Sequence, residues 1–132
     1  MKKWFTVGLI LAISVAVSAV LSYWYTRHVE GQHRAGYQAT LAAYRAALAP
    51  GTSREQVESF LRSKGVPYRR TCCAPGVFSD LTKIGQEPPN LVCREWGVYL
   101  EFKFDNETTH APTATPTDGL TSIDIHEQGI CL

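Results

Sequence analysis

The chain has no excess of charge of either sign. Among its 132 residues, 13 are Lys or Arg and 12 are Asp or Glu, which leaves a formal net charge of +1. Only Lys2 and Lys3 precede residue 27, so residues 27–132 carry 11 basic against 12 acidic side chains. This balance excludes the basic footprint of a nucleic-acid-binding protein and the polybasic cluster that recognises anionic lipids.

Charge is absent altogether from one long stretch, Trp4–Tyr25. As a helix it would be roughly 33 Å long, enough to cross the hydrocarbon core of a bilayer. Aromatic residues at both of its ends suit the membrane interfaces, and Lys2 and Lys3 favour a cytoplasmic N-terminus. We therefore expect a single transmembrane helix over residues 1–27, which anchors the chain in the inner membrane and places the rest in the periplasm.

A cleaved signal peptide is the alternative for this stretch. Val17, Ser18 and Ala19 would supply a small-residue cleavage site. The apolar run exceeds the roughly 7–15 residues of a signal core, which favours an uncleaved anchor. A lipobox is missing, because the first cysteine is Cys72, and this excludes a lipid anchor on an N-terminal cysteine. Either alternative carries the residues after Arg27 across the membrane.

The chain also lacks a Cys-x-x-Cys motif, which argues against a thioredoxin-like site. Its four cysteines are Cys72, Cys73, Cys93 and Cys131. In a small domain outside the cytoplasm, an even number of cysteines indicates two disulfides. A bridge between the adjacent Cys72 and Cys73 would close a small, strained ring. We therefore expect Cys72–Cys93 with Cys73–Cys131, or Cys73–Cys93 with Cys72–Cys131, and both pairings stay open.

Residues 28–50 are predicted to form a membrane-proximal helix that stops at Pro50. Gly31 and Gly36 weaken its first part, so we expect a hinge or frayed segment near them and a firm helix over about 36–48. Larger apolar residues recur at spacings of four, three and four, which predicts one buried face. They are Tyr37, Leu41, Tyr44 and Leu48.

A second helix is predicted over about Ser53–Ser63. Thr52 and Glu55 have the spacing of a capping box at its start, and Gly65 suits the left-handed position that follows its end. The helical period predicts one buried stripe and one solvent-facing side. The stripe consists of Val57, Phe60 and Leu61, and the solvent-facing residues are Arg54, Glu58 and Arg62.

Strands without intervening helices are predicted to follow. The segment from Val98 to Phe104 alternates apolar and polar residues and is expected to be the central strand. Shorter extended segments are expected at Asp80–Ile84, at Leu120–Glu127 and around Leu91–Cys93. Consecutive strands usually form an antiparallel sheet. The predicted fold class is α+β, with the N-terminal transmembrane helix followed by two helices packed on a small antiparallel sheet of three to four strands.

Three short motifs resemble those of the SmpA/OmlA/BamE-like group of small bacterial envelope proteins. They are GTSREQV at Gly51–Val57, YLEFKFD at Tyr99–Asp105 and DGLTSI at Asp118–Ile123. The resemblance covers about residues 51–127 and implies a layered fold of two helices and three strands, in an α+β envelope domain over residues 51–132. Similar uncharacterised membrane-anchored members carry no known function.

No motif places a nucleophile beside a base, and no cofactor or metal template is present. We therefore expect a non-catalytic protein-interaction module of the cell envelope, not an enzyme, without cofactor, metal, nucleic acid or small-molecule substrate. Its partners would be the membrane and another envelope protein. The alternative is a thiol-based redox or soft-metal-handling protein that uses the vicinal Cys72 and Cys73.

Overall fold

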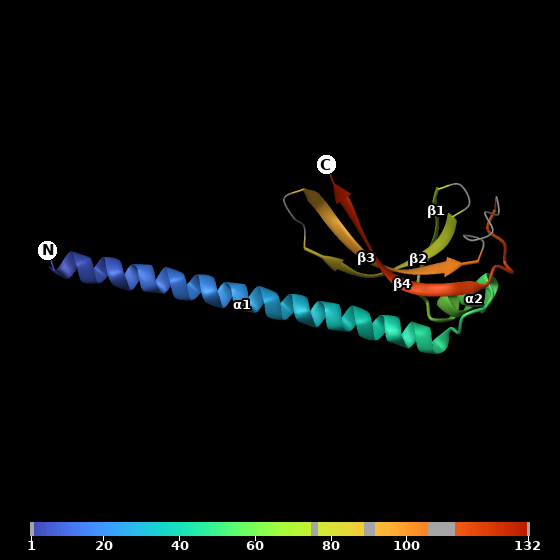
Figure 1. Cartoon of the computed structure of the whole chain (residues 1–132), viewed down its shortest axis with the longest axis horizontal. Coiled ribbons are helices and arrows are strands. Elements are labelled where there is room, and N and C mark those ends of the chain that lie inside the picture. The colour runs from blue at the N-terminus through green and yellow to red at the C-terminus, as the bar shows by residue number, and fades with distance from the viewer. Residues whose placement is uncertain (1, 75–76, 89–91, 106–112, 132) are drawn as a thin grey trace. The chain divides into compact units, whose positions relative to one another are not determined.

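The computed structural model describes the backbone of residues 2–74, 77–88, 92–105 and 113–131. It describes their side chains too, except those of residues 2–7, 9, 10, 72–74, 77 and 130. The chain divides into two compact units, Met1–Gly36 and Tyr37–Leu132. Helix α1, Lys2–Ala47, belongs to both units, and the second unit adds helix α2 and four strands (Figure 1).

The expected transmembrane helix is not supported. In the part of the chain that the structure describes, no helix is both long enough and apolar enough to span a bilayer. A frayed segment near Gly31 and Gly36 is not observed, because the backbone is α-helical through both, although the boundary between the two compact units falls after Gly36.

Helix α2, Arg54–Ser63, begins one residue later than the sequence predicts. The capping box uses Ser53 and Gln56, so the expected caps Thr52 and Glu55 are corrected. The Ser53 hydroxyl accepts from the Gln56 N–H, and the Gln56 side chain accepts from the Ser53 N–H at 3.2 Å. Tertiary pairing explains the shift: Ser53 forms a β-bridge with Gly119, which keeps its backbone extended.

The turns around α2 follow the sequence more closely. The Thr52 hydroxyl donates to the Ala49 carbonyl at 2.6 Å, after the end of α1, and so has a local role of its own. Gly65 has a φ of +67°, the left-handed conformation predicted for the residue beyond the helix. Gly51 has a φ of +87° in the turn between the two helices.

The four strands form one antiparallel sheet in the order β1-β2-β3-β4, as the neighbouring arrows of Figure 1 show. Each strand pairs with the next in sequence, which confirms the predicted antiparallel sheet. The strands are longer than expected. Their bounds are β1 Arg69–Ala74, β2 Val77–Glu87, β3 Cys93–Phe104 and β4 Leu120–Cys131.

The core lies between one face of this sheet and the two helical segments of the second unit. The predicted inward side chains of β3 are fully buried, and Ile123 of β4 lies beside them. The predicted helix stripes cover this face, which confirms the two-layer arrangement. The buried residues on the helical side are Leu41 of α1, Leu48 just after its end, and Val57 and Leu61 of α2, while Tyr44 and Phe60 are partly buried against them.

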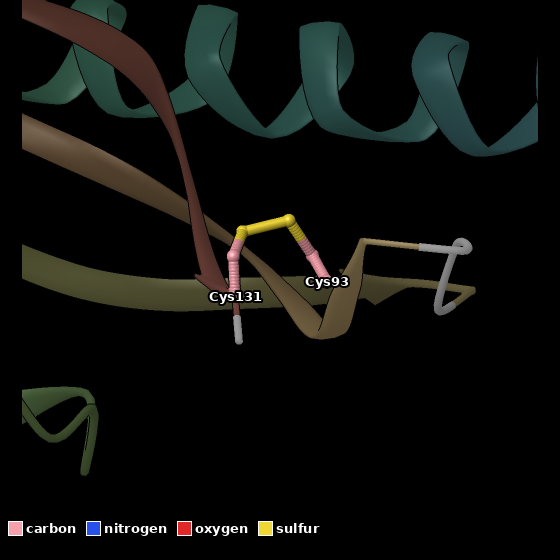
Figure 2. The surroundings of a disulfide bond; sticks show 2 residues. All are labelled: Cys93 and Cys131. Carbon is pink, nitrogen blue, oxygen red and sulfur yellow. A yellow bond between two sulfur atoms is a disulfide. The ribbon is translucent and has the colours of Figure 1, made fainter.

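A disulfide joins Cys93 to Cys131, and both expected pairings are therefore wrong (Figure 2). These two cysteines lie opposite each other on the neighbouring strands β3 and β4, with Cα atoms 3.8 Å apart. The sequence disfavours this pairing, because it leaves Cys72 and Cys73 only a strained bridge to each other. The register of β3 and β4 nevertheless brings Cys93 and Cys131 together. The side chains of Cys72 and Cys73 lie outside the described residues.

Candidate interaction surface

Arg54 is the largest fully buried side chain among the described residues, with an exposed fraction of 0%. Its position in α2 explains the burial, because residues 54, 57 and 61 share one helix face. The expectation that Arg54 faces solvent is therefore wrong. Its guanidinium lies over the ring of Phe104 at 3.9 Å from the centroid, on the helix-covered face of the sheet.

Two carboxylates neutralise the buried guanidinium. Arg54 Nη1 donates to Asp80 Oδ1 at 2.8 Å, and Nε lies 3.5 Å from Asp118 Oδ2. Nη2 donates to the Phe78 carbonyl of β2. The cluster thus joins the start of α2, strand β2 and the segment before β4. We call Arg54, Asp80 and Asp118 the buried cluster.

Burial also changes the acid–base properties of this cluster. Desolvation raises the pKa of Asp80 to about 6, although the charge of Arg54 opposes the shift. Its Oδ2 atom is buried without a hydrogen bond to any described residue, which is consistent with a disfavoured carboxylate form. Nearby Glu58 is also desolvated, but hydrogen bonds from Arg70 and Tyr68 lower its pKa overall.

The buried cluster is suited to holding elements together and not to chemistry. The side chains of Arg54 and Asp80 are fully buried and the Asp118 carboxylate is nearly so, which leaves no room for a substrate at these charges. The described residues also contain no group of three or more His, Cys, Asp or Glu side chains placed to hold a metal ion.

The opposite face of the sheet is where solvent-accessible side chains gather. Side chains alternate along a strand, so the residues of β3 between the buried ones point away from the helices. Tyr99, Glu101 and Lys103 have this position and are partly exposed. Strand pairing adds Leu81, opposite Glu101, and His126, opposite Tyr99. We call this surface the open face.

An arginine crosses the open face. Arg69 of β1 lies over the ring of Tyr99 on β3, 5.0 Å from its centroid, and Nη2 donates to Gln128 Oε1 of β4 at 2.8 Å. The Tyr99 ring lies over Gly97, where any Cβ atom would meet the ring at less than 3 Å. Glycine at position 97 is thus required for this ring position.

Two hollows flank the Arg69–Tyr99 pair, since both residues line each of them. One has a volume of about 150 Å³ and is also lined by Glu95, Gly97 and Gln128. The other has a volume of about 270 Å³. It combines two cations with aromatic and apolar groups, and its remaining lining residues are Pro67, Tyr68, Leu81 and Lys83. We call this second one the Arg69 hollow.

The other cations of the open face are neutralised. Lys83 lies 3.1 Å from Glu95, and Lys103 lies 3.5 Å from Asp124 and 3.9 Å from Glu101. The imidazole of His126, which is not counted among these cations, has Nδ1 3.7 Å from Glu101 Oε2. Arg69 differs, because it forms no ion pair with any residue that the structure describes.

The free edge of β4 is less available than the open face. Two nitrogens of Arg45, at the end of α1, donate to the Ile123 carbonyl at 2.9 and 2.7 Å. The same guanidinium lies 3.0 Å from Asp124. A side chain that occupies an edge carbonyl blocks the addition of another strand at that point. The open face is therefore the better candidate interaction surface.

The alternation along Val98–Phe104 predicts that Tyr99, Glu101 and Lys103 face away from the core, and the structure has them there, but no motif marks this face as a site. Of the predicted site residues, Cys93 and Cys131 are brought together as a disulfide, and Thr52 and Glu55 lie at the start of α2 without forming its cap. Arg69, the first residue of β1, is marked by no motif or spacing in the sequence. The spacing of Arg54 from Val57 and Leu61 was a signal that could have identified the buried arginine.

No protein-family model, no curated protein and no solved structure matches this chain.

Proposed function

We propose that the unit Tyr37–Leu132 is a non-catalytic protein-interaction module of the bacterial cell envelope, and that it docks another envelope protein on its open face. The observation that carries this proposal is the contrast between the two faces of one sheet. Helices cover one face of the sheet. On the other face, the Arg69 guanidinium is stacked on the Tyr99 ring, and two hollows lie beside this pair. Aromatic and arginine side chains are enriched in protein interfaces.

The disulfide supports a location outside the cytoplasm, which we propose to be the periplasm. Cytosolic thiols are kept reduced, so structural disulfides are rare in most cytosolic proteins. Cys93–Cys131 closes the ends of β3 and β4, next to Glu95 and Gln128 of the smaller hollow. An oxidising compartment would thus stabilise the surface that we assign to docking. The resemblance to SmpA/OmlA/BamE-like proteins is kept as a proposal of the same kind.

Site-specific photocrosslinking in the producing cells tests the docking face. A photoreactive amino acid at His126 reports on the open face, and one at Ser59 reports on the exposed side of α2 as the matched control. We expect one discrete crosslinked protein from position 126 and none from position 59. Equal adducts from both positions, or none from either, would contradict a module that docks through the open face.

A second candidate function uses Cys72 and Cys73. Cys93 and Cys131 bond to each other and are therefore unavailable as partners of Cys72 and Cys73. Cys72 and Cys73 can then form a bridge with each other, stay as free thiols or bond to another molecule. A vicinal dithiol is suited to reversible oxidation or to binding a soft metal ion. Thiol titration of the native protein tests this candidate: two reactive thiols that disappear in a Cys72→Ser, Cys73→Ser variant favour it. Their absence favours the docking module alone.

A further inference from the structure

We propose that the open face binds an acidic, extended polypeptide segment, with a carboxylate of that segment seated in the Arg69 hollow against the Arg69 guanidinium. This inference rests on the proposed docking function and names the chemistry of the partner. It is carried by the charge balance of the face, the order of the Arg69 side chain and the lining of the hollow.

Charge balance gives the sign of the ligand. Lys83 and Lys103 each have a carboxylate within 4 Å, whereas Arg69 has none among the described residues. The Arg69 hollow is lined by Arg69 and Lys83 and by no acidic side chain. The smaller hollow includes Glu95, which Lys83 neutralises. An anionic group is therefore best accommodated in the Arg69 hollow.

The order of Arg69 gives the kind of anion. Stacking on Tyr99 and the hydrogen bond from Nη2 to Gln128 hold the planar guanidinium in place. Nε and Nη1 form no hydrogen bond with the described residues, and Nη2 has a second N–H besides the one that Gln128 accepts. One of the two donor edges of the guanidinium, Nε with Nη2 or Nη1 with Nη2, is therefore available. A carboxylate accepts such donors in pairs, and little side-chain entropy is lost because the guanidinium is already ordered.

The lining of the hollow gives the partner class. Leu81 is buried, and it lines the hollow together with Pro67 and Tyr99, so apolar surface lies beside the two cations. A volume of about 270 Å³ accommodates one or two side chains and not a large cofactor. A polypeptide that alternates acidic and apolar residues presents both kinds of group within this space.

Fluorescence polarisation with the full chain tests the proposal. The probe is a labelled peptide of alternating Val and Glu with blocked ends, and the control probe replaces each Glu by Gln. We expect binding of the Glu peptide only, weakened about tenfold or more by Arg69→Gln, because a charge-assisted pair is lost. Lys103→Gln removes another cation of the same face and is expected to change affinity less than twofold. Circular dichroism checks that both variants stay folded.

Several outcomes would overturn the inference. They are equal binding of the Gln peptide, an affinity unchanged by Arg69→Gln, and binding of anionic vesicles or inorganic phosphate in place of the Glu peptide. The crosslinking test separates this failure from failure of the docking function. If the adduct at position 126 persists in the Arg69→Gln variant, the module still docks there but not through an acidic segment. If the unsubstituted protein neither binds the Glu peptide nor gives the adduct at position 126, both proposals are contradicted.

Discussion

Two arginines lie over aromatic rings of the same strand, on opposite faces of the sheet. Arg54 lies over Phe104 beneath α2, fully buried, with two carboxylates within 4 Å. Arg69 lies over Tyr99 on the open face, exposed, with the neutral Gln128 as its hydrogen-bond partner. A buried charge is costly unless it is paired, whereas an exposed one is solvated by water. One arginine is thus committed to the fold, and the other is available to a partner.

Removing each arginine in turn should produce the largest difference between the two faces. Arg54→Met leaves Asp80 buried without its main partner, and we expect a loss of about 3–5 kcal/mol in the free energy of unfolding. Arg69→Met is the matched control on the exposed side and should change stability by less than about 0.5 kcal/mol. Urea denaturation followed by circular dichroism measures both. Similar losses for the two variants would contradict the division into a structural and an available arginine.

The disulfide joins the start of β3 to the end of β4. A Cys93→Ala, Cys131→Ala double variant should lose about 2–4 kcal/mol, because a loop of 38 residues is no longer closed in the unfolded chain. We also expect the Glu peptide to bind more weakly, since Gln128 lies three residues from Cys131. An unchanged melting temperature in this variant, or in the native protein with reductant, would show that the bridge adds no stability.

The two faces should also differ in pH dependence. Burial raises the pKa of Asp80 from 3.8 to about 6, so its contribution to stability is fully present below pH 4 and is lost as the pH rises through about 6. Asp124 on the open face has a lowered pKa, as Ser122 and Lys103 outweigh its desolvation. Its contribution is present above pH 4 and is lost as the pH falls.

Asp80→Asn and Asp124→Asn separate these opposite signs. The stability of the native protein relative to Asp80→Asn should fall by about 3 kcal/mol at most between pH 4 and 7, at about 1.4 kcal/mol per pKa unit. Relative to Asp124→Asn, it should rise from pH 3 to 5. Denaturant midpoints across this range measure both. The same sign for the two residues would mean that burial does not distinguish the two faces.

The parts of the fold that depend on local period were predictable from the sequence. Alternation along β3 placed Val98, Leu100, Phe102 and Phe104 in the core because neighbouring side chains of a strand must point to opposite faces. The same reasoning missed Arg54, since a charged residue is normally assigned to solvent whatever its spacing. Its burial depends on Asp80 and Asp118, which lie in other elements of the chain.

The open face and the disulfide depended on contacts between strands. Pairing of Leu100 with Ile125 extends, with a bulge after Cys93, to the pairing of Cys93 with Cys131. The predicted strands, Val98–Phe104 and Leu120–Glu127, are too short to include the Cys93–Cys131 pair. Likewise, Arg69 reaches Tyr99 and Gln128 across intervening strands, and no spacing along the sequence carries that information.

The smallest expected effect concerns the helix start that places Arg54. The Ser53 side chain accepts a hydrogen bond from the Gln56 N–H, so Ser53→Ala should lose about 1 kcal/mol. Thr52→Ala removes only the bond to the Ala49 carbonyl and should lose less. Because the cap lies on the helix-covered side, neither substitution should alter binding of the Glu peptide at Arg69. A larger loss for Thr52→Ala in denaturant melts would restore position 52 as the cap, and a binding change in either variant would couple the two faces that the sheet separates.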